Sequence, residues 1–146
     1  MLSSGRSTPL SWAAANGHDD VLKTLLDTDG VDVDSRDKYG RTPLSWAVEK
    51  GHEAVVEILL DTGKVDVNSR DKRGHTPLAG SAENGHEAVV KTLVNTGKVD
   101  VDSKAKYGQT PALWAAKSGH EALVKMLLDT GKADVNSKDE HGQTSF

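Results

Sequence analysis

The sequence contains no cysteine among its 146 residues, and only six residues are aromatic. Without thiols the chain can form neither a disulfide framework nor a thiolate metal site, which fits a reducing, cytoplasmic (intracellular) environment. No apolar run approaches the roughly 20 residues that a membrane-spanning helix needs. The first residues, MLSSGRS, lack the apolar segment of a secretory signal peptide. These features favour a soluble protein that does not bind membranes.

Charge and apolar residues are also limited. The formal net charge is only −4, so the chain is neither a polyanion nor a basic protein built to bind phosphate backbones. The length fits one domain. Apolar residues make up 36% of the chain, which is low for one central core. An array of small units explains this value, because each unit buries only the faces that meet its neighbours.

The sequence does contain such an array. Threonines at positions 8, 42, 76, 110 and 144 are each 34 residues apart, and Gly-His pairs recur with the same spacing. Residues 40–73 match residues 74–107 at 20 of 34 positions. The period is the first feature to interpret, since repeats of this length indicate stacked supersecondary units.

One unit shows how the pattern predicts structure. Thr42 can cap a helix, and Pro43 is favoured at a first helical position. Gly51 then ends that helix, and Glu53 begins a second one with an acid near its positive end. A polar extended segment and the tight turn Asp71-Lys72-Arg73-Gly74 follow. The same reading predicts four helix pairs, at about 9–27, 43–61, 77–95 and 111–129.

The residue pattern is more specific than the period. The units share the frame Gly-x-Thr-Pro-Leu-x-x-Ala…Gly-His-x-x-Val-Val-x-x-Leu-Leu…Gly…Asp-Val-Asn, which resembles the ankyrin repeat over residues 8–146, although Ser81 replaces the alanine in the third unit and Ala112 the leucine in the fourth. The Trp, Leu-Gly and Tyr spacing of the tetratricopeptide repeat, which also has 34 residues, is absent. The resemblance implies an all-α ankyrin-repeat solenoid of four stacked helix–turn–helix units with β-turn/hairpin finger loops. It implies one domain over residues 1–146, with units at 8–39, 40–73, 74–107 and 108–141 and the start of a fifth at 142–146.

In finer detail the repeats resemble arrays of fungal ankyrin proteins, many of which resemble NOD-like receptors. The last helix pair keeps the apolar pattern of an interior unit, whereas solenoids normally end in polar caps. The chain is therefore expected to be an excerpt or tail of a larger sensor or scaffold protein. A monomer is expected, with end-to-end stacking of arrays as an alternative.

Candidates for chemistry are weak. The four histidines after glycine, His18, His52, His86 and His120, lie one repeat apart, too far to share a metal ion, and are expected to fasten the turn within each helix pair. No cysteine or nucleophile elbow is present, and no Gly-x-x-x-x-Gly-Lys-Ser/Thr phosphate loop occurs. The chain is therefore expected to be no enzyme and to need no metal or cofactor.

The remaining candidates lie on the surface. Ankyrin proteins generally bind through their finger turns and the adjoining face of the first helix of each unit. The resemblance carries this role to a basic finger strip: Arg36, Lys38, Tyr39, Arg41, Lys50, Arg70, Lys72, Arg73, His75, Lys104, Lys106, Tyr107, Gln109 and Lys117. Lys138 begins the next finger. With Lys138, the strip holds eleven of the 18 basic residues but only six of the 22 acidic ones, so its formal charge is +5 and that of the rest is −9.

Two interpretations of the strip stay open. Either the finger turns are polar only because they are solvated, or the strip steers an acidic protein or peptide into a concave finger/helix surface, with Tyr39 and Tyr107 as anchors. Nucleic acid is not the expected partner, because the strip is mixed in sign and has few stacking aromatics. The favoured function is non-catalytic protein–protein interaction. The alternative is a purely structural spacer array without a ligand.

One position breaks the pattern. Gly80 occupies the place of Trp12, Trp46 and Trp114 in the other units. Glycine costs roughly 1 kcal/mol in a helix interior, and the loss of a buried tryptophan adds more. The sequence favours a tolerated defect that Leu113 or a neighbouring tryptophan partly refills, over a hinge or a binding pocket.

Overall fold

The computed structural model describes residues 8–134 and 136. In this part of the chain eight α-helices form four pairs and no strand is present. The pairs are α1 (Pro9–Asn16) with α2 (Asp19–Leu26), α3 (Pro43–Lys50) with α4 (Glu53–Asp61), α5 (Pro77–Glu83) with α6 (Glu87–Asn95), and α7 (Pro111–Lys117) with α8 (Glu121–Asp129). The predicted all-α array of four helix pairs is confirmed.

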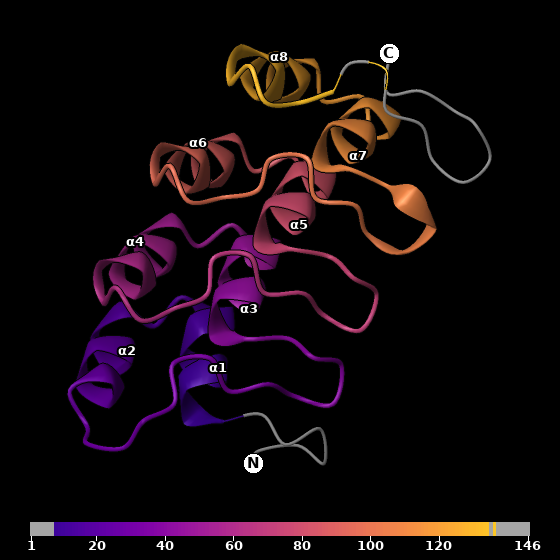
Figure 1. Ribbon diagram of the computed structural model, residues 1–146. Helices are drawn as coiled ribbons and strands as arrows, with labels where there is room; N and C mark the ends of the chain where they lie inside the picture. Colours follow the sequence, from indigo (N-terminus) through magenta and orange to yellow (C-terminus); the bar gives the residue numbers. More distant parts are fainter. Residues whose placement is uncertain (1–7, 135, 137–146) are drawn as a thin grey trace.

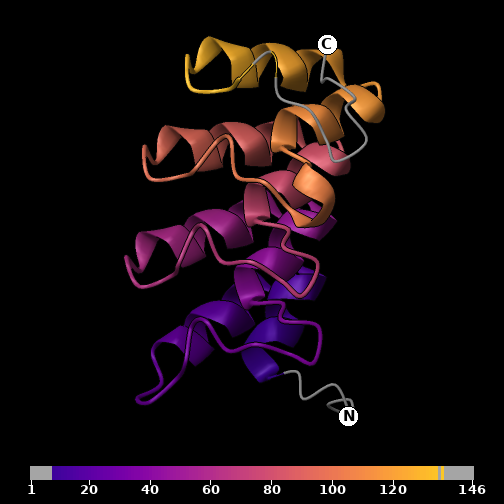
Figure 2. The same ribbon diagram turned by 45° about the vertical axis from the view of Figure 1, so that its right-hand side comes forward.

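The pairs stack into a solenoid, and we number the repeats one to four from the first pair. Figures 1 and 2 show α1, α3, α5 and α7 as one layer and α2, α4, α6 and α8 as a second, with the finger turns projecting beyond the first layer. Contacts run from each helix to the equivalent helix of the next repeat and to its own partner. Stacking therefore produces one continuous core, as the low apolar content requires.

The first helix of each pair, α1, α3, α5 or α7, is called the inner helix. Its start is determined by a threonine and the proline that follows it. Thr42 Oγ1 accepts a hydrogen bond from Ser45 N at 3.2 Å, and Pro43 occupies the first turn. The threonines at 8, 76 and 110 make the same cap. These bonds satisfy amide groups that would otherwise lack a partner at the helix start.

The core is built from aliphatic side chains of both layers. The largest fully buried side chains are leucines and valines: Leu10, Leu22, Leu44, Leu59, Leu78, Leu93, Leu113, Leu123, Leu127, Val48, Val55 and Val56. Small residues such as Ala47 and Ala82 lie between them and are also fully buried. The small side chains let neighbouring inner helices approach closely while the leucines fill the space between layers.

The recurring histidines join neighbouring repeats. His52 Nε2 lies 3.0 Å from Ala15 O of the preceding repeat, and His86 Nε2 lies 3.0 Å from Glu49 O. The expectation that each histidine fastens the turn of its own helix pair is therefore wrong for these two. The ring passes against the preceding helix end, where a Cβ on Gly51 would lie 2.8 Å from His86. Gly51 is needed for this contact and for its positive φ of 75°.

The finger turns at 36–41 and 70–75 are β-turns closed by an aspartate. Asp37 Oδ1 accepts hydrogen bonds from Tyr39 N at 2.9 Å and from Arg41 N at 3.0 Å. Asp71 does the same one repeat later. Backbone bonds link successive fingers, from Lys72 N to Tyr39 O at 2.9 Å. Neighbouring turns are therefore hydrogen-bonded side by side, although they form no strands in the described part of the chain.

Some predicted features lie outside the described residues. These are the start of a fifth unit at 142–146 and Lys138 at the far end of the basic finger strip. The unit boundaries stay a prediction. Among the residues that the structure describes, no helix has the length and apolar character needed to cross a membrane.

Candidate functional site

The basic finger strip maps onto one surface. We call this surface the finger face: the turns at 36–41, 70–75 and 104–109 together with the adjoining sides of α3, α5 and α7. Figure 1 shows these turns projecting in the same direction from successive repeats. The structure places the predicted residues along this surface, but in different environments.

The tips of two fingers carry exposed aromatic rings. Tyr39 is 52% exposed and Tyr107 is 53% exposed. Lys38 Nζ lies 5.0 Å from the centre of the Tyr39 ring, and Lys106 Nζ lies 5.7 Å from that of Tyr107. Each tip therefore combines a rigid apolar surface with a cation held beside it.

Two arginines of the strip fasten the fingers to one another. Arg36 Nη1 donates to Arg70 O in the next finger at 2.6 Å, and Arg70 Nη1 donates to Lys104 O at 2.7 Å. A second bond joins Arg70 Nη2 to Ser103 Oγ at 3.0 Å. These guanidinium groups hold the spacing of the fingers, so their main contribution is to the shape of the surface.

The other basic residues are arranged around them. Lys50, Lys72, Lys104 and Lys117 are exposed, with Lys50 and Lys117 at the ends of α3 and α7. Gln109 is half-buried at the base of the finger turn at 104–109. In the described part of the chain no three histidine or carboxylate side chains converge as metal ligands.

Repeat two contains a complete stack of side chains. Arg41 Cζ lies 4.6 Å from the Trp46 ring centre and 5.4 Å from that of Tyr39. The guanidinium also pairs with Glu49 Oε2 at 3.6 Å. Trp46 Nε1 donates to Asp37 Oδ2 at 3.1 Å. The indole is thus fixed by a carboxylate at one edge and a cation on its face.

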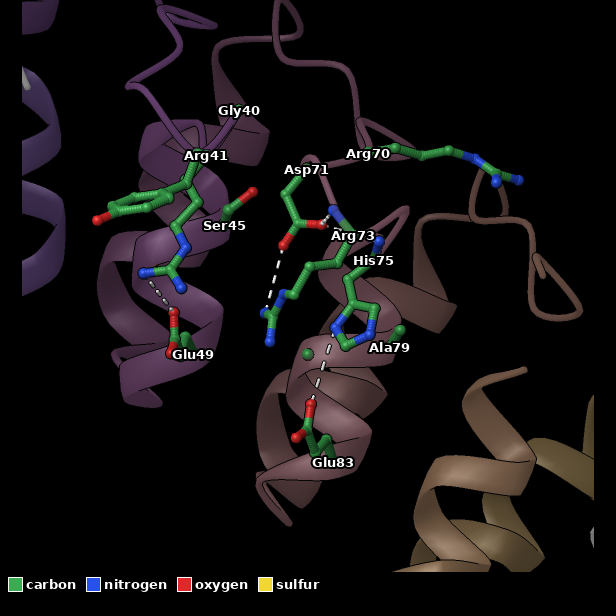
Figure 3. A network of polar contacts seen from close by, with 12 residues as sticks. Gly40, Arg41, Ser45, Glu49, Arg70, Asp71, Arg73, His75, Ala79 and Glu83 are labelled. Atoms are coloured by element: carbon green, nitrogen blue, oxygen red, sulfur yellow. Dashed lines mark hydrogen bonds and ion pairs between the residues drawn. The ribbon is translucent and has the colours of Figure 1, made fainter. Parts of the chain in front are cut away.

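Repeat three has the carboxylate but lacks the indole. Figure 3 shows Asp71, Arg73, His75 and Glu83 around this position. Asp71 Oδ2 pairs with Arg73 Nη2 at 3.4 Å, and His75 Nδ1 lies 3.8 Å from Glu83 Oε2. The first contact is long, and the Arg73 side chain is 56% exposed, so the pair is weakly held.

His75 is the most buried member of the predicted strip, with 7% exposure. Its ring packs edge-on against Trp114, with ring centres 5.1 Å apart. Burial lowers the pKa of His75 below its ordinary value, and the charge of Arg73 lowers it further. The carboxylates of Asp71 and Glu83 oppose this shift. His75 therefore contributes a neutral ring to the surface near neutral pH.

A recess of about 80 Å³ opens beside Gly80. A Cβ built on Gly80 would have Val48 Cγ2, 3.9 Å away, as its nearest described neighbour outside the α5 backbone. The wall of the recess consists mainly of polar and charged groups: Arg41, Ser45, Glu49, Asp71, Arg73, His75, Thr76, Glu83 and Asn84. The predicted refilling by Leu113 or a neighbouring tryptophan is absent at Gly80, and Leu113 is buried with 2% exposure.

The expectation that the tryptophans are buried in the core is also wrong. Trp46 and Trp114 lie on the finger face and are half-buried, and Trp12 of α1 is 44% exposed. The spacing of apolar residues along the helix indicates this exposure, because the buried residues of α3 are Pro43, Leu44, Ala47 and Val48. Position 46 lies off that stripe. The missing indole at Gly80 therefore alters the finger face and leaves the core intact.

Repeat four has the indole but lacks the carboxylate. Ala105 stands where the other fingers have Asp37 and Asp71. Trp114 Nε1 is buried without a hydrogen-bond partner among the residues that the structure describes. The finger forms a short 3₁₀ turn, Lys106–Gly108, in which Tyr107 has a positive φ of 71°. Such a conformation is unfavourable for a non-glycine residue, and Ala105 offers no side-chain acceptor to hold the turn as in the other fingers.

The comparison with known families agrees with this architecture. The family model described as ankyrin repeats (three copies) matches residues 2–71 and 63–139. The chain therefore belongs to the ankyrin-repeat family. Domains of this family are generally protein–protein interaction modules and typically have no catalytic activity. No curated protein matches the chain.

Proposed function

We propose that this chain recognises a protein or peptide through its finger face and performs no catalysis. The observation that carries the proposal is the pair of exposed tyrosines, Tyr39 and Tyr107, each beside a lysine on a finger tip. Tyrosine offers a large contact surface and loses little side-chain entropy on binding. The hydrogen bonds of Arg36 and Arg70 keep the tips at a set spacing before a partner arrives.

The preferred partner is acidic. The lysines at the finger tips are exposed, and the strip carries most of the positive charge of the chain. A positive surface raises the association rate of a negatively charged partner and makes that rate sensitive to salt. The surrounding protein would be a larger sensor or scaffold, of the kind suggested by the resemblance to fungal NOD-like-receptor arrays. The intracellular setting, the monomeric state and the alternative of end-to-end stacking stay predictions.

Charge reversal tests the proposal. The triple substitution of Lys38, Lys72 and Lys106 by glutamate changes exposed residues of three fingers without touching Arg36 or Arg70. The matched control reverses Lys64, Lys98 and Lys132, which are exposed and recur with the same period after α4, α6 and α8. A partner captured by the wild-type chain should lose at least about tenfold in affinity with the finger variant, and little with the control.

The competing function is a structural spacer without a ligand. The bonds between fingers from Arg36 and Arg70 favour it, since they stiffen the array whether or not a partner binds. Equal capture by the wild type and both variants would contradict recognition through the finger face. It would leave the spacer as the better description.

A further inference from the structure

We propose that the recess at Gly80 receives an indole side chain from the partner, which completes in repeat three the stack that Trp46 forms in repeat two. This inference rests on the proposed function and names the chemistry of one contact within it. The argument has three steps: the place is open, its hydrogen-bond acceptor is present, and a cation is available to cover the ring.

The place is open because Gly80 has no side chain, and within the described part of the chain the one atom within 4 Å of a Cβ built there, outside the α5 backbone, is Val48 Cγ2. The three other repeats have tryptophan at this position, so the spacing of the helices and fingers already accommodates a ring here. The recess of about 80 Å³ adjoins Gly80, Asp71 and His75 and opens on the finger face. A ring that enters it would be partly buried, as the half-buried Trp46 is in its own repeat.

The acceptor is Asp71 Oδ2. The two aspartates use Oδ1 in the same way, since Asp37 binds Tyr39 N and Arg41 N, and Asp71 binds Arg73 N and His75 N. In repeat two the second oxygen accepts the Trp46 indole at 3.1 Å. In repeat three its contact among the described residues is the 3.4 Å one with Arg73. An indole N–H from the partner can take the place of this weak contact by displacing Arg73.

The cation is Arg73. Its side chain is more than half exposed, and Figure 3 shows it extending into the space between α3 and α5. On displacement from Asp71 it can lie over the ring, as Arg41 lies over Trp46 at 4.6 Å. The ring of His75, which packs against Trp114, borders the recess. A tryptophan fits these groups better than an aliphatic side chain, which offers neither a donor nor a face for a cation.

The test titrates the whole 146-residue chain, labelled with nitrogen-15, with N-acetyl-tryptophanamide, its N-methylindole analogue and N-acetyl-leucinamide. We expect N-acetyl-tryptophanamide to shift the amide signals of Gly80, Arg73 and His75 and to leave those of repeat one unchanged. The N-methylindole analogue should bind about fivefold more weakly, because it cannot donate to Asp71. N-acetyl-leucinamide should bind more weakly still.

Two variants specify the place. Gly80→Trp fills the recess and should weaken binding of N-acetyl-tryptophanamide at least about tenfold. Gly80→Ala adds only a methyl 3.9 Å from Val48 and should preserve binding. Absence of shifts around Gly80 in the wild-type chain would overturn the proposal, as would equal binding of leucinamide or equal binding by a folded Gly80→Trp variant. These probes contain no partner, so their failure leaves recognition through the finger tips to its own charge-reversal test.

Discussion

Repeats two and three share most of their residues, yet their finger faces differ in completeness. Repeat two holds both halves of a contact, the Asp37 carboxylate and the Trp46 indole. Repeat three keeps the carboxylate of Asp71 and has Gly80 in place of the indole. The finger turn and the helix start are the same in both, because aspartate closes the finger and threonine caps the helix regardless of the ring. The comparison separates what builds the repeat from what shapes its surface.

Repeat four supplies the complementary case. It keeps Trp114 but has Ala105 in place of the aspartate. There the backbone does change, since the finger becomes a 3₁₀ turn with Tyr107 at positive φ. Loss of the indole alters only the surface, whereas loss of the carboxylate alters the finger itself.

The largest expected effect comes from breaking the complete contact. Trp46→Ala removes a half-buried ring, the bond to Asp37 and the stacking on Arg41. We expect the free energy of unfolding to fall by about 2–3 kcal/mol, less than for a fully buried tryptophan. Urea denaturation followed by circular dichroism measures it. Trp12→Ala is the control, since that ring is 44% exposed and should cost only about 1 kcal/mol.

Restoring the carboxylate in repeat four should have the next largest effect. Ala105→Asp gives the buried Trp114 Nε1 an acceptor and lets the finger adopt the turn of its neighbours. We expect a gain of about 2 kcal/mol in the same denaturation measurement. Tyr107→Gly is the control, because it relieves only the backbone and should gain about 1 kcal/mol. An Ala105→Asp variant no more stable than the wild type would contradict the role assigned to this aspartate.

Restoring the indole in repeat three is expected to stabilise less. Gly80→Trp removes a helix glycine and adds a ring that can bond to Asp71, for a gain of about 1–2 kcal/mol. Gly80→Ala should gain about 1 kcal/mol from helix propensity alone. Thermal unfolding of both variants measures the difference. A lower melting temperature for Gly80→Trp would mean that the recess cannot hold a ring.

The smallest effect concerns pH and the residue that replaces Arg41 in repeat three. Burial lowers the pKa of His75 in the folded chain, so the unfolded chain binds its proton more readily. The neutral His75 ring contributes fully to the free energy of unfolding at a pH above the ordinary histidine pKa of about 6.5. This contribution is lost as the pH falls through the pKa of His75 in the folded chain. His75→Gln should reduce this loss of stability in acid. His18→Gln, a change at an exposed position, is the control. Identical pH profiles for wild type and His75→Gln would show that His75 does not contribute.

The fold could be predicted in detail because its determinants are local. Thr42 and Pro43 start a helix, Gly51 ends it, and the 34-residue period repeats these signals four times. The helix pairs at 43–61, 77–95 and 111–129 match the observed elements, and the pair at 9–27 extends one residue too far. The contacts of His52, His86 and His120 with a glycine of the preceding repeat escaped prediction, because they join residues of different repeats.

The candidate site was predictable only in outline. Sequence position placed Lys38, Tyr39, Lys106 and Tyr107 on the finger tips, and the structure finds them exposed there. The sequence could not show that Arg70 is hydrogen-bonded to the next finger or that His75 is buried. Both outcomes depend on side chains that meet across 33 to 39 residues, for which the sequence contains no local signal.

The sequence by itself determined the helices, the turns, the repeat count in the described part and the family, because each depends on residues within one period. Tertiary structure decided what lies against the side of α3 and α5 outside their buried stripe, namely the finger turns. As a result Trp46, expected in the core, makes a surface contact, and Gly80, expected in the core, lines a recess. The physical reason is that a short helix packed on both neighbours buries a narrow stripe, and residues just outside that stripe belong to the surface.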